Sequence, residues 1–302
     1  MSSSEPPVLV TGASSGIGRA ITEFLSAKGV AVYATARKGA DLKELGRIPN
    51  VTPVRLDVRK PEEVRRAAAV LSKGTTRLRG LVNNAGIADA WPLPETRDED
   101  LWTILDVNLF GVHRMVRAFL PHLVAGRGRI VNMSSISGLG TSRMIGAYSV
   151  TKHALEAYSE VLAGTLGPYG VKVSLVEPGN FRSDIWSNAA RTVRRRSRSV
   201  KGAVMQDEIR KTFKEFETDE DPDTYPTPEP VAEAVADALF AKDPRFRYVV
   251  APDLEEFRWP AESLIWRAIQ AAEGIPHRLT REDLHGMIDR FWERASREPM
   301  PP

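Results

Sequence analysis

Short apolar runs alternate with helical patterns along most of the chain. Seven runs rich in Val, Ile and Leu lie at 7–10, 30–36, 51–58, 80–86, 128–135, 171–179 and 246–251. Strands that are nearly continuous in such residues are buried on both faces of a sheet. Because helical segments separate them, the pattern predicts a parallel, doubly wound α/β sheet with helices on both faces.

The helical patterns and two irregular regions set the expected domain organisation. Helices are expected at 17–27, at 61–71 with Pro61 at the start, at 148–166, and at 96–124 after a capping box of Thr96 and Glu99. Residues 180–227 are polar, lack strong periodicity and are broken by prolines, which is typical of a functional or mobile connection. We therefore expect one domain at 1–251 with a lid at about 180–227. A C-terminal helical extension at 252–302, with Thr280 as a helix cap and a frayed end, is expected to pack on that domain.

Composition argues against several classes of site and protein. The 302 residues include no cysteine, which excludes disulfides, thiolate nucleophiles and cysteine-based zinc sites. The five histidines lack metal-ligand spacing, so no metal site is expected. A net charge of +3 gives no reason to expect nucleic-acid binding. The N-terminus lacks a signal-peptide pattern and no apolar stretch is long enough to span a bilayer, so a cytoplasmic protein without membrane contact is expected.

The first expected strand runs directly into a glycine-rich turn, TGASSGIG, at residues 11–18. Gly12 permits the tight exit from the strand, Gly16 lets the backbone approach a pyrophosphate, and Gly18 allows close helix–strand packing. The helix N-terminus then offers free N–H groups to phosphates. A turn without a ligand is the alternative, but the position between strand and helix favours a dinucleotide site on a Rossmann fold. The remaining turn residues expected to contact the dinucleotide are Ser14, Ser15 and Ile17.

The end of the second expected strand indicates which dinucleotide is bound. NAD enzymes of this fold usually place an acid there, on the ribose 2′-hydroxyl. Here Ala36 occupies that place and Arg37 follows it. A guanidinium can hold a 2′-phosphate with two hydrogen bonds, whereas a carboxylate would repel it. Arg37 could instead be an ordinary exposed cation, but the missing acid predicts NADP(H) in preference to NAD(H).

Tyr148 and Lys152 are four residues apart and would share one face of a helix. A phenol has an ordinary pKa of about 10, too high for a base at neutral pH. A nearby ammonium and the positively charged nicotinamide are both expected to lower that pKa, so that Tyr148 can give a proton to a carbonyl oxygen or take one from an alcohol. Alone this pair is weak, because Tyr and Lys at this spacing often only pack on a surface.

Together these pieces resemble the short-chain dehydrogenase/reductase family, in the branch with a TGxxxGxG turn and a YxxxK pair. The likeness covers about residues 8–185, and more weakly 228–251. Seven pieces in the family's order are far more specific than any one of them. They are TGASSGIG, LDV with Asp57, NNAG at 83–86, VNLFG with Asn108, SSISG with Ser135, YSVTK and EPGNFRS.

The resemblance implies a role for each matched position. Ser135 is expected to hydrogen-bond the substrate oxygen and Tyr148 to transfer the proton. Lys152 is expected to bind the nicotinamide ribose, with Asn108 holding a water that links it to solvent, and Asn83 to tie the sheet together. The other implied cofactor contacts are Asp57 with Val58 at the adenine, Asn84, Ala85 and Gly86 along the adenosine, and Pro178, Gly179, Phe181 and Ser183 around the nicotinamide. The family commonly has Thr where this chain has Ser183.

Two features, a basic run and an aromatic set, each have a structural and a functional interpretation. The basic run at 191–201 could recognise an acidic substrate, but a solvated, mobile segment is the favoured interpretation. The aromatic set of Trp259, Trp266, Phe291 and Trp292 could dock on a membrane or a subunit, but core packing of the added helices is favoured.

The function expected from these observations is reversible hydride transfer between NADP(H) and a ketone, aldehyde or alcohol. Phe181, Ile185 and Trp186 begin the lid, which favours a bulky, largely apolar substrate. An NADP(H)-binding regulator or scaffold without turnover, or a dehydratase or epimerase on the same fold, are the alternatives. The resemblance also implies a homodimer or homotetramer, formed through the helices at 97–124 and 148–166.

Overall fold

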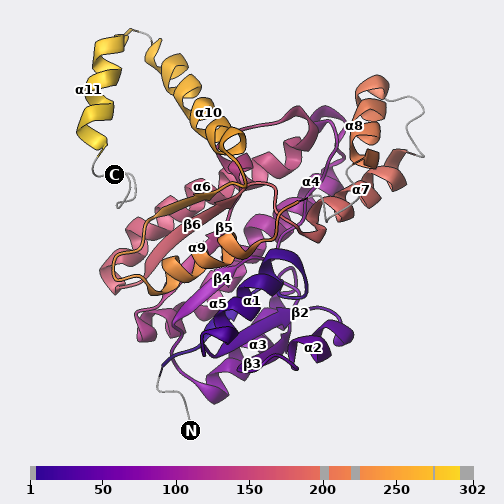
Figure 1. Cartoon of the computed structure of the whole chain (residues 1–302), viewed down its shortest axis with the longest axis vertical. Coiled ribbons are helices and arrows are strands. Elements are labelled where there is room, and N and C mark those ends of the chain that lie inside the picture. The colour runs from indigo at the N-terminus through magenta and orange to yellow at the C-terminus, as the bar shows by residue number, and fades with distance from the viewer. Residues whose placement is uncertain (1–4, 198–203, 219–224, 275, 293–302) are drawn as a thin grey trace.

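The computed structural model describes residues 5–197, 204–218, 225–274 and 276–292. Seven parallel strands form one sheet in the order β3-β2-β1-β4-β5-β6-β7 (Figure 1). Every strand expected from the apolar runs is present, and the doubly wound α/β fold is confirmed. The strands are β1 (Val8–Val10), β2 (Val32–Ala36), β3 (Val51–Arg55), β4 (Gly80–Asn83), β5 (Arg129–Met133), β6 (Lys172–Pro178) and β7 (Arg247–Val250).

Helices cover both faces of the sheet and create two cores. On one face α1 (Gly16–Ala27), α2 (Gly39–Leu45) and α9 (Glu229–Phe240) pack through residues such as Ile21, Leu45 and Val235. On the other face α3 (Pro61–Gly74), α5 (Gly111–Gly126) and α6 (Gly146–Leu166) pack around Phe119. The order of strands reverses between β1 and β4, and in such sheets a crevice opens at the carboxyl ends of the strands.

The expected long helix at 96–124 is three pieces. α4 (Asp98–Leu105) begins after Arg97, so the predicted capping box is wrong: the Thr96 hydroxyl donates to the Pro92 carbonyl oxygen at 3.2 Å instead. A π-helical turn at Asp106–Phe110 then leads into α5. Such wider turns are common at functional sites, and this one contains Asn108.

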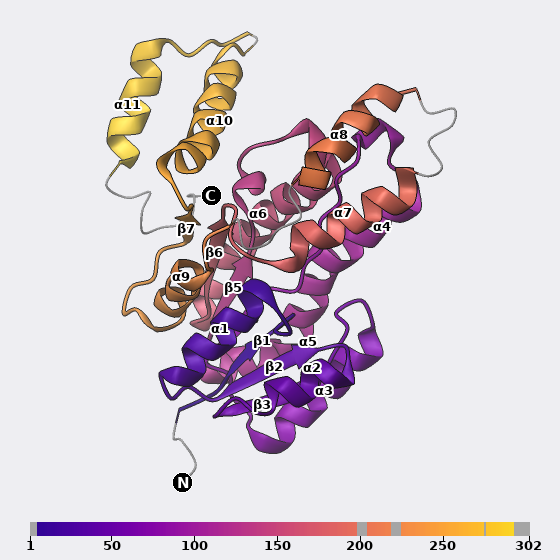
Figure 2. The same ribbon diagram turned by 45° about the vertical axis from the view of Figure 1, so that its right-hand side comes forward.

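The region at 180–227 is more regular than its sequence suggested. It contains α7 (Asp184–Ser197) and α8 (Gln206–Thr218), separated by residues outside the described ranges. The two helices lie together on one side of the molecule, and the C-terminal helices lie on another (Figures 1 and 2). The polar composition of this region hid its helical pattern, because few apolar residues mark the inward faces.

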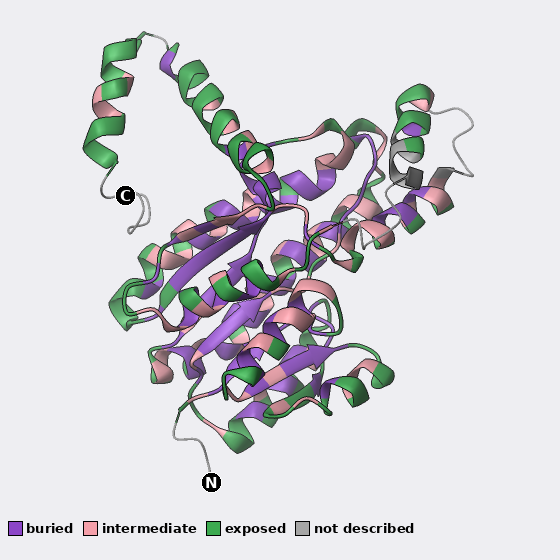
Figure 3. Ribbon diagram, viewed as in Figure 1, coloured by how far each residue is buried: buried purple, intermediate pink, exposed green. Residues whose placement is uncertain are grey.

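The C-terminal extension forms α10 (Leu254–Ala272) and α11 (Arg281–Phe291). The expected cap at Thr280 is present as a capping box with Asp283. Both helices are mostly exposed (Figure 3). The interpretation of the aromatic set as core packing is therefore wrong for three of its members: Phe291 is 43%, Trp266 64% and Trp292 77% exposed. Trp259 is partly buried and packs against Gly140. Among the described helices, none combines the length and the apolar character that crossing a membrane requires.

Candidate active site

A cavity of about 1400 Å³ opens at the carboxyl ends of the strands. It runs from the glycine-rich turn after β1, past the ends of β2 to β6, to the start of α7. Every site residue expected from the sequence lines it except Asn108. These lining residues are Gly12, Ser14, Ser15, Gly16, Ile17, Gly18, Arg37, Asp57, Val58, Asn84, Ala85, Gly86, Ser135, Tyr148, Lys152, Pro178, Gly179, Phe181 and Ser183.

The glycine-rich turn requires glycine for two separate reasons. Gly12 has φ +65° and Gly16 has φ +53°, a left-handed conformation that side chains rarely adopt. A Cβ on Gly12 would also lie 2.8 Å from the Ala85 Cα, and one on Gly18 would overlap the Asn84 amide. The turn therefore packs backbone against the segment after β4, and its other side is open to the cavity.

Thr11 and Asn84 hold this turn in place. The Thr11 hydroxyl accepts from the backbone N–H groups of Asn84 and Ala85, at 2.9 and 3.0 Å. The Asn84 side chain donates to the backbone oxygens of Thr11 and Gly12, at 2.9 and 3.1 Å. Asn84 is predicted to lie along the adenosine, and Thr11 is not among the predicted site residues. Both position the turn.

The turn and the start of α1 fit a dinucleotide pyrophosphate. Within the described chain, Ser15 caps α1 without a side-chain hydrogen bond, so N–H groups of the first turn remain available to an anion. A Cβ on Gly16 would lie 3.0 Å from the Ser183 Cβ, which places the residues just before α7 directly beside the turn. Because Gly16 has no side chain, the backbone of the turn stays accessible from the cavity at this point.

The end of the cavity beside β2 and β3 carries two guanidinium groups. Arg37 follows Ala36 at the end of β2. Arg59, which the sequence analysis did not select, donates to both carboxylate oxygens of Asp57, at 3.1 and 2.7 Å. The hydrogen bond from Arg59, together with the positive charge of Arg37, holds the pKa of the Asp57 carboxyl below its usual range despite partial burial. The Asp57 carboxylate is therefore anionic and already partnered on one side.

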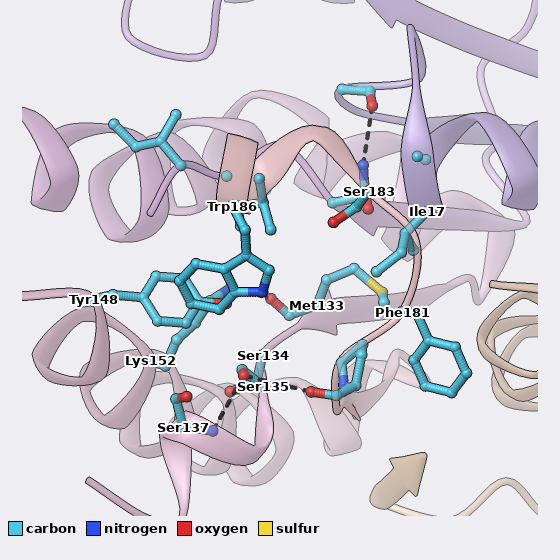
Figure 4. A pocket seen from close by; sticks show the side chains of 18 of the residues that line it. Ile17, Met133, Ser134, Ser135, Ser137, Tyr148, Lys152, Phe181, Ser183 and Trp186 are labelled. Atoms are coloured by element: carbon cyan, nitrogen blue, oxygen red, sulfur yellow. Dashed lines mark hydrogen bonds between the residues drawn. The ribbon is translucent and has the colours of Figure 1, made fainter. Parts of the chain in front are cut away.

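Ser135, Tyr148 and Lys152 meet at the other end of the cavity (Figure 4). The Ser135 hydroxyl caps the short turn at Ile136–Gly138 by accepting from the Ser137 N–H at 3.1 Å. It also donates to the Pro178 carbonyl oxygen at 3.4 Å. The Lys152 Nζ donates to the Met133 carbonyl oxygen at 2.7 Å and lies 5.4 Å from the centre of the Tyr148 ring.

Burial controls the ionisation of this pair. It raises the pKa of Tyr148 to about 12, against the hydrogen bond with Ser135, which lowers it. Burial lowers the pKa of Lys152 to about 8, against the carboxylate of Glu156, which raises it. The expectation that Lys152 lowers the Tyr148 pKa is therefore wrong for the protein alone, because removal of both groups from water outweighs their interaction.

Asn108 lies behind the cavity wall. Its side chain accepts from the Ile87 N–H at 2.9 Å and donates to the Ile87 carbonyl and the Thr151 hydroxyl, at 2.9 and 3.0 Å. Both amide hydrogens are thus used within the protein. Any water on Asn108 would have to donate to the remaining lone pair of its oxygen. Asn83, expected to tie the sheet together, donates to the Asn132 side chain at 2.8 Å.

The basic run is not simply solvated. Arg196, near the end of α7, donates to both carboxylate oxygens of Asp89 at 2.9 and 2.8 Å and pairs with Asp100 at 2.9 Å. Its side chain is only 14% exposed, and its guanidinium lies over the Trp91 ring. The interpretation of a solvated segment is therefore wrong for this residue, which ties α7 to α4 and to the loop after β4. Positions 198–201 of the run lie outside the described residues.

The cavity also includes residues outside the predicted catalytic and cofactor-binding set. Trp186 of α7 lies over the Tyr148 ring, with centroids 5.7 Å apart and planes at 67° (Figure 4). Glu256 and Trp259 of α10 line the mouth. Nothing in the local sequence around 256–259 connects it to β6, which ends 78 residues before Glu256 at Pro178, so only the fold could reveal this contact.

The comparisons with known proteins agree with this geometry. The family described as short chain dehydrogenase matches residues 7–194. Bovine mitochondrial D-beta-hydroxybutyrate dehydrogenase is 36% identical over 263 residues, covering 80% of this chain and 75% of that protein. The NADPH-dependent 3-dehydrocapnine reductase of Ornithobacterium rhinotracheale is 35% identical over 253 residues, covering 81% of this chain and 87% of its own. Other curated relatives are matched over about half to two thirds of their length.

A solved structure is similar over nearly the whole chain. The crystal structure of a short-chain dehydrogenase from Streptomyces avermitilis superimposes with a TM-score of 0.68 and 28% identity, covering 97% of this chain and 98% of that one. With the family match, these relatives and the cavity geometry together, the chain belongs to the short-chain dehydrogenase/reductase family and is an oxidoreductase that acts on CH–OH or C=O groups with a nicotinamide cofactor.

Proposed function

We propose that this chain is an NADP(H)-dependent ketoreductase that interconverts a ketone or aldehyde and an alcohol, with Tyr148 as the acid/base. The observation that carries the proposal is the convergence of Ser135, Tyr148 and Lys152 at one end of the cavity whose other end holds the glycine-rich turn and Arg37. The cofactor, when bound, supplies or accepts the hydride.

The residues of the chain supply position and proton transfer. Tyr148 is protonated at neutral pH because burial raises its pKa to about 12, so it is ready to donate to a carbonyl oxygen. Ser135 reaches the same oxygen with its hydroxyl, exchanging its long bond to Pro178 for one to substrate. Lys152 anchors the nicotinamide ribose and, when charged, favours the phenolate that remains after proton transfer.

The preference for NADP(H) rests on Ala36 and Arg37. The wall beside the expected ribose has no acid at the end of β2, and Arg37 lies close enough to contribute to the low pKa of the Asp57 carboxyl after the larger effect of Arg59. The Ornithobacterium relative, by its name, uses NADPH. A 2′-phosphate would meet positive charge here rather than a carboxylate.

The substrate is proposed to be bulky and largely apolar, and α7 with α8 to act as its lid. Trp186 and Ile185 border the cavity next to Tyr148. Arg196 holds α7 to Asp89 and Asp100. Closure of such a segment would exclude water and strengthen the electrostatics around the reacting oxygen.

Trp186→Ala is expected to raise KM for bulky carbonyls at least severalfold and to leave small carbonyls and NADPH affinity nearly unchanged. The reason is that the indole covers the Tyr148 ring and offers apolar surface to the larger substrates. Steady-state kinetics with a series of ketones of increasing size measures the effect, with Trp266→Ala on exposed α10 as the matched control. If Trp186→Ala and the wild type have equal KM values for every ketone in the series, the proposed specificity is contradicted.

Carbonyl reduction is expected to slow as pH rises through about 8. Lys152 carries its charge below its lowered pKa of about 8 and loses it above, so it then no longer favours the Tyr148 phenolate. The pH profile of kcat/KM reports such a group in the free enzyme. In Lys152→Arg the guanidinium stays charged, so the alkaline decline should move to higher pH. A wild-type profile that stays flat through the alkaline range would exclude this role.

NADPH oxidation with a panel of aldehydes and ketones tests the function as a whole. Binding of NADPH without turnover on any member would favour a regulator or scaffold. A changed product without net cofactor consumption would favour a dehydratase or epimerase.

We further propose a cytoplasmic homodimer or homotetramer. The exposed side chains of Trp102, Val150 and Val161 on α4 and α6 support the association. Sedimentation measures the oligomeric state.

A further inference from the structure

The C-terminal extension begins directly beside the active site. After β7 the chain turns into α10, where the Asp253 side chain accepts from the Glu256 N–H at 2.9 Å and fixes the first turn. This N-terminal cap determines where the Glu256 side chain lies, at the mouth of the cavity. The remainder of α10 and α11 extends away from the sheet (Figures 1 and 2).

The Glu256 carboxylate holds Asn180 with both oxygens. Oε2 accepts from the Asn180 backbone N–H at 2.8 Å, and Oε1 accepts from its side-chain amide at 2.7 Å. The preceding residue, Gly179, leaves room for this contact, since a Cβ there would overlap the carboxylate. One ionised side chain therefore satisfies two donors of the same residue, an arrangement stronger than two neutral hydrogen bonds.

Asn180 lies just beyond β6, in the cavity wall between Ser135 on one side and the buried Phe181 on the other. Gly179 is the first residue after β6, and its N–H still donates to the Val250 carbonyl oxygen of β7 at 2.7 Å, so Asn180 follows directly beyond the sheet. Pro178 accepts from Ser135, and Phe181 is buried on the other side. Any shift of Asn180 would therefore move the wall on which, by the family resemblance, the nicotinamide lies.

Two further contacts place α10 against the elements that carry the candidate catalytic groups. The Trp259 ring packs on Gly140, where a Cβ would lie 2.6 Å from it, and Gly140 follows the turn capped by Ser135. Arg267 donates to the His153 ring at 2.9 Å, directly after Lys152 on α6. Residues along α10 thus contact three segments that surround the reacting centre.

We propose that Glu256 is a positioning residue, which sets the Pro178–Gly179–Asn180 wall and so the nicotinamide end of the bound cofactor. The inference rests on the proposed NADP(H)-dependent function. It assigns the start of the extension to the active site, although the sequence placed it in a separate helical addition. Adenosine binding at Arg37 and the glycine-rich turn should not depend on it, because those residues lie at the other end of the cavity.

The test compares NADPH with adenosine 2′,5′-bisphosphate, which lacks the nicotinamide half, on the full chain carrying Glu256→Gln. A glutamine offers one acceptor and turns an N–H₂ donor toward the other Asn180 donor. NADPH affinity is expected to fall roughly tenfold, which corresponds to about 1.4 kcal/mol, while affinity for the bisphosphate stays unchanged. With NADPH deuterated at the transferred position, the isotope effect on kcat should rise, because a misplaced nicotinamide makes hydride transfer limiting.

Two further variants separate positioning from folding. Glu273→Gln, at the other end of α10, removes only an exposed ion pair with Arg278 and should bind both ligands as the wild type does. Asn180→Ala removes the side-chain donor and should add little to Glu256→Gln, since the two variants break the same contact. If Glu256→Gln weakens the affinity for both ligands equally, or weakens neither affinity, the inference is overturned. A wild-type protein that binds neither ligand would instead overturn the proposed function, and the inference with it.

Discussion

Tyr148→Phe is expected to reduce turnover by about 10²–10⁴-fold, the range typical of lost acid–base catalysis, and to leave NADPH affinity near the wild-type value. The substitution removes only the phenol oxygen. The ring keeps its contact with Trp186 and its place over Lys152, so the cavity keeps its shape. Single-turnover NADPH oxidation and fluorescence titration of NADPH measure the two quantities separately.

Tyr169→Phe is the matched control, because Tyr169 is 61% exposed after α6 and far from the cavity lining. It should retain wild-type turnover. When the Tyr148 hydroxyl is removed, the Ser135 hydroxyl keeps its hydrogen bonds with the Pro178 carbonyl and the Ser137 N–H, so the loss should cost little stability. A Tyr148→Phe protein that is folded and turns over at near the wild-type rate would remove Tyr148 from the mechanism.

Local periodicity was sufficient to predict the sheet. The five inner strands are short apolar runs, and their burial on both faces follows from the helices that cover them, whereas the edge strands β3 and β7 are partly exposed. The order of the motifs along the chain also predicted which loops meet, because the carboxyl ends of parallel strands lie at one edge. This is why residues as distant as Gly12 and Phe181 could be assigned to one cavity from the sequence.

Properties that depend on contacts between distant segments were not predictable in the same way. The favoured interpretation of Arg196 was solvation, yet Asp89 and Asp100 neutralise it from two other elements. Thr96 has the sequence of a helix cap, but its hydroxyl finds the Pro92 carbonyl first. In both cases the local pattern was compatible with several partners, and tertiary packing selected one.

The pKa of Tyr148 likewise depends on how distant segments pack around it. The spacing of Tyr148 and Lys152 correctly indicated that they meet, and electrostatics alone predicted a lowered phenol pKa. Burial of both groups, which the sequence does not display, has the larger effect and raises it to about 12. Lys152 is affected in the complementary sense, with its pKa lowered to about 8, because the buried ammonium is also disfavoured.

Arg37→Asp is expected to reverse or abolish the preference for NADPH over NADH. A charge-assisted hydrogen bond contributes about 1.5–3 kcal/mol, so loss of a guanidinium from the 2′-phosphate should weaken NADPH binding by about 10- to 150-fold. The new carboxylate would also repel the phosphate. For NADH the same carboxylate can accept from the ribose 2′-hydroxyl, as acids at this position do in NAD enzymes of this fold.

The effect of Arg37→Asp is expected to be confined to the region where the 2′-phosphate binds. Ala36, beside Arg37, leaves space at the end of β2. Arg59 is held by Asp57 through two hydrogen bonds, so of these two neighbouring guanidinium groups Arg37 is the one placed to turn toward a phosphate. Arg65→Asp on exposed α3 makes the same change of charge away from the cavity and should leave the ratio of NADPH to NADH affinity unaltered. Titration of both cofactors against the three proteins gives that ratio. If wild-type protein already prefers NADH, or if Arg37→Asp leaves the ratio as it is in wild type, the positive charge at Arg37 does not select the cofactor.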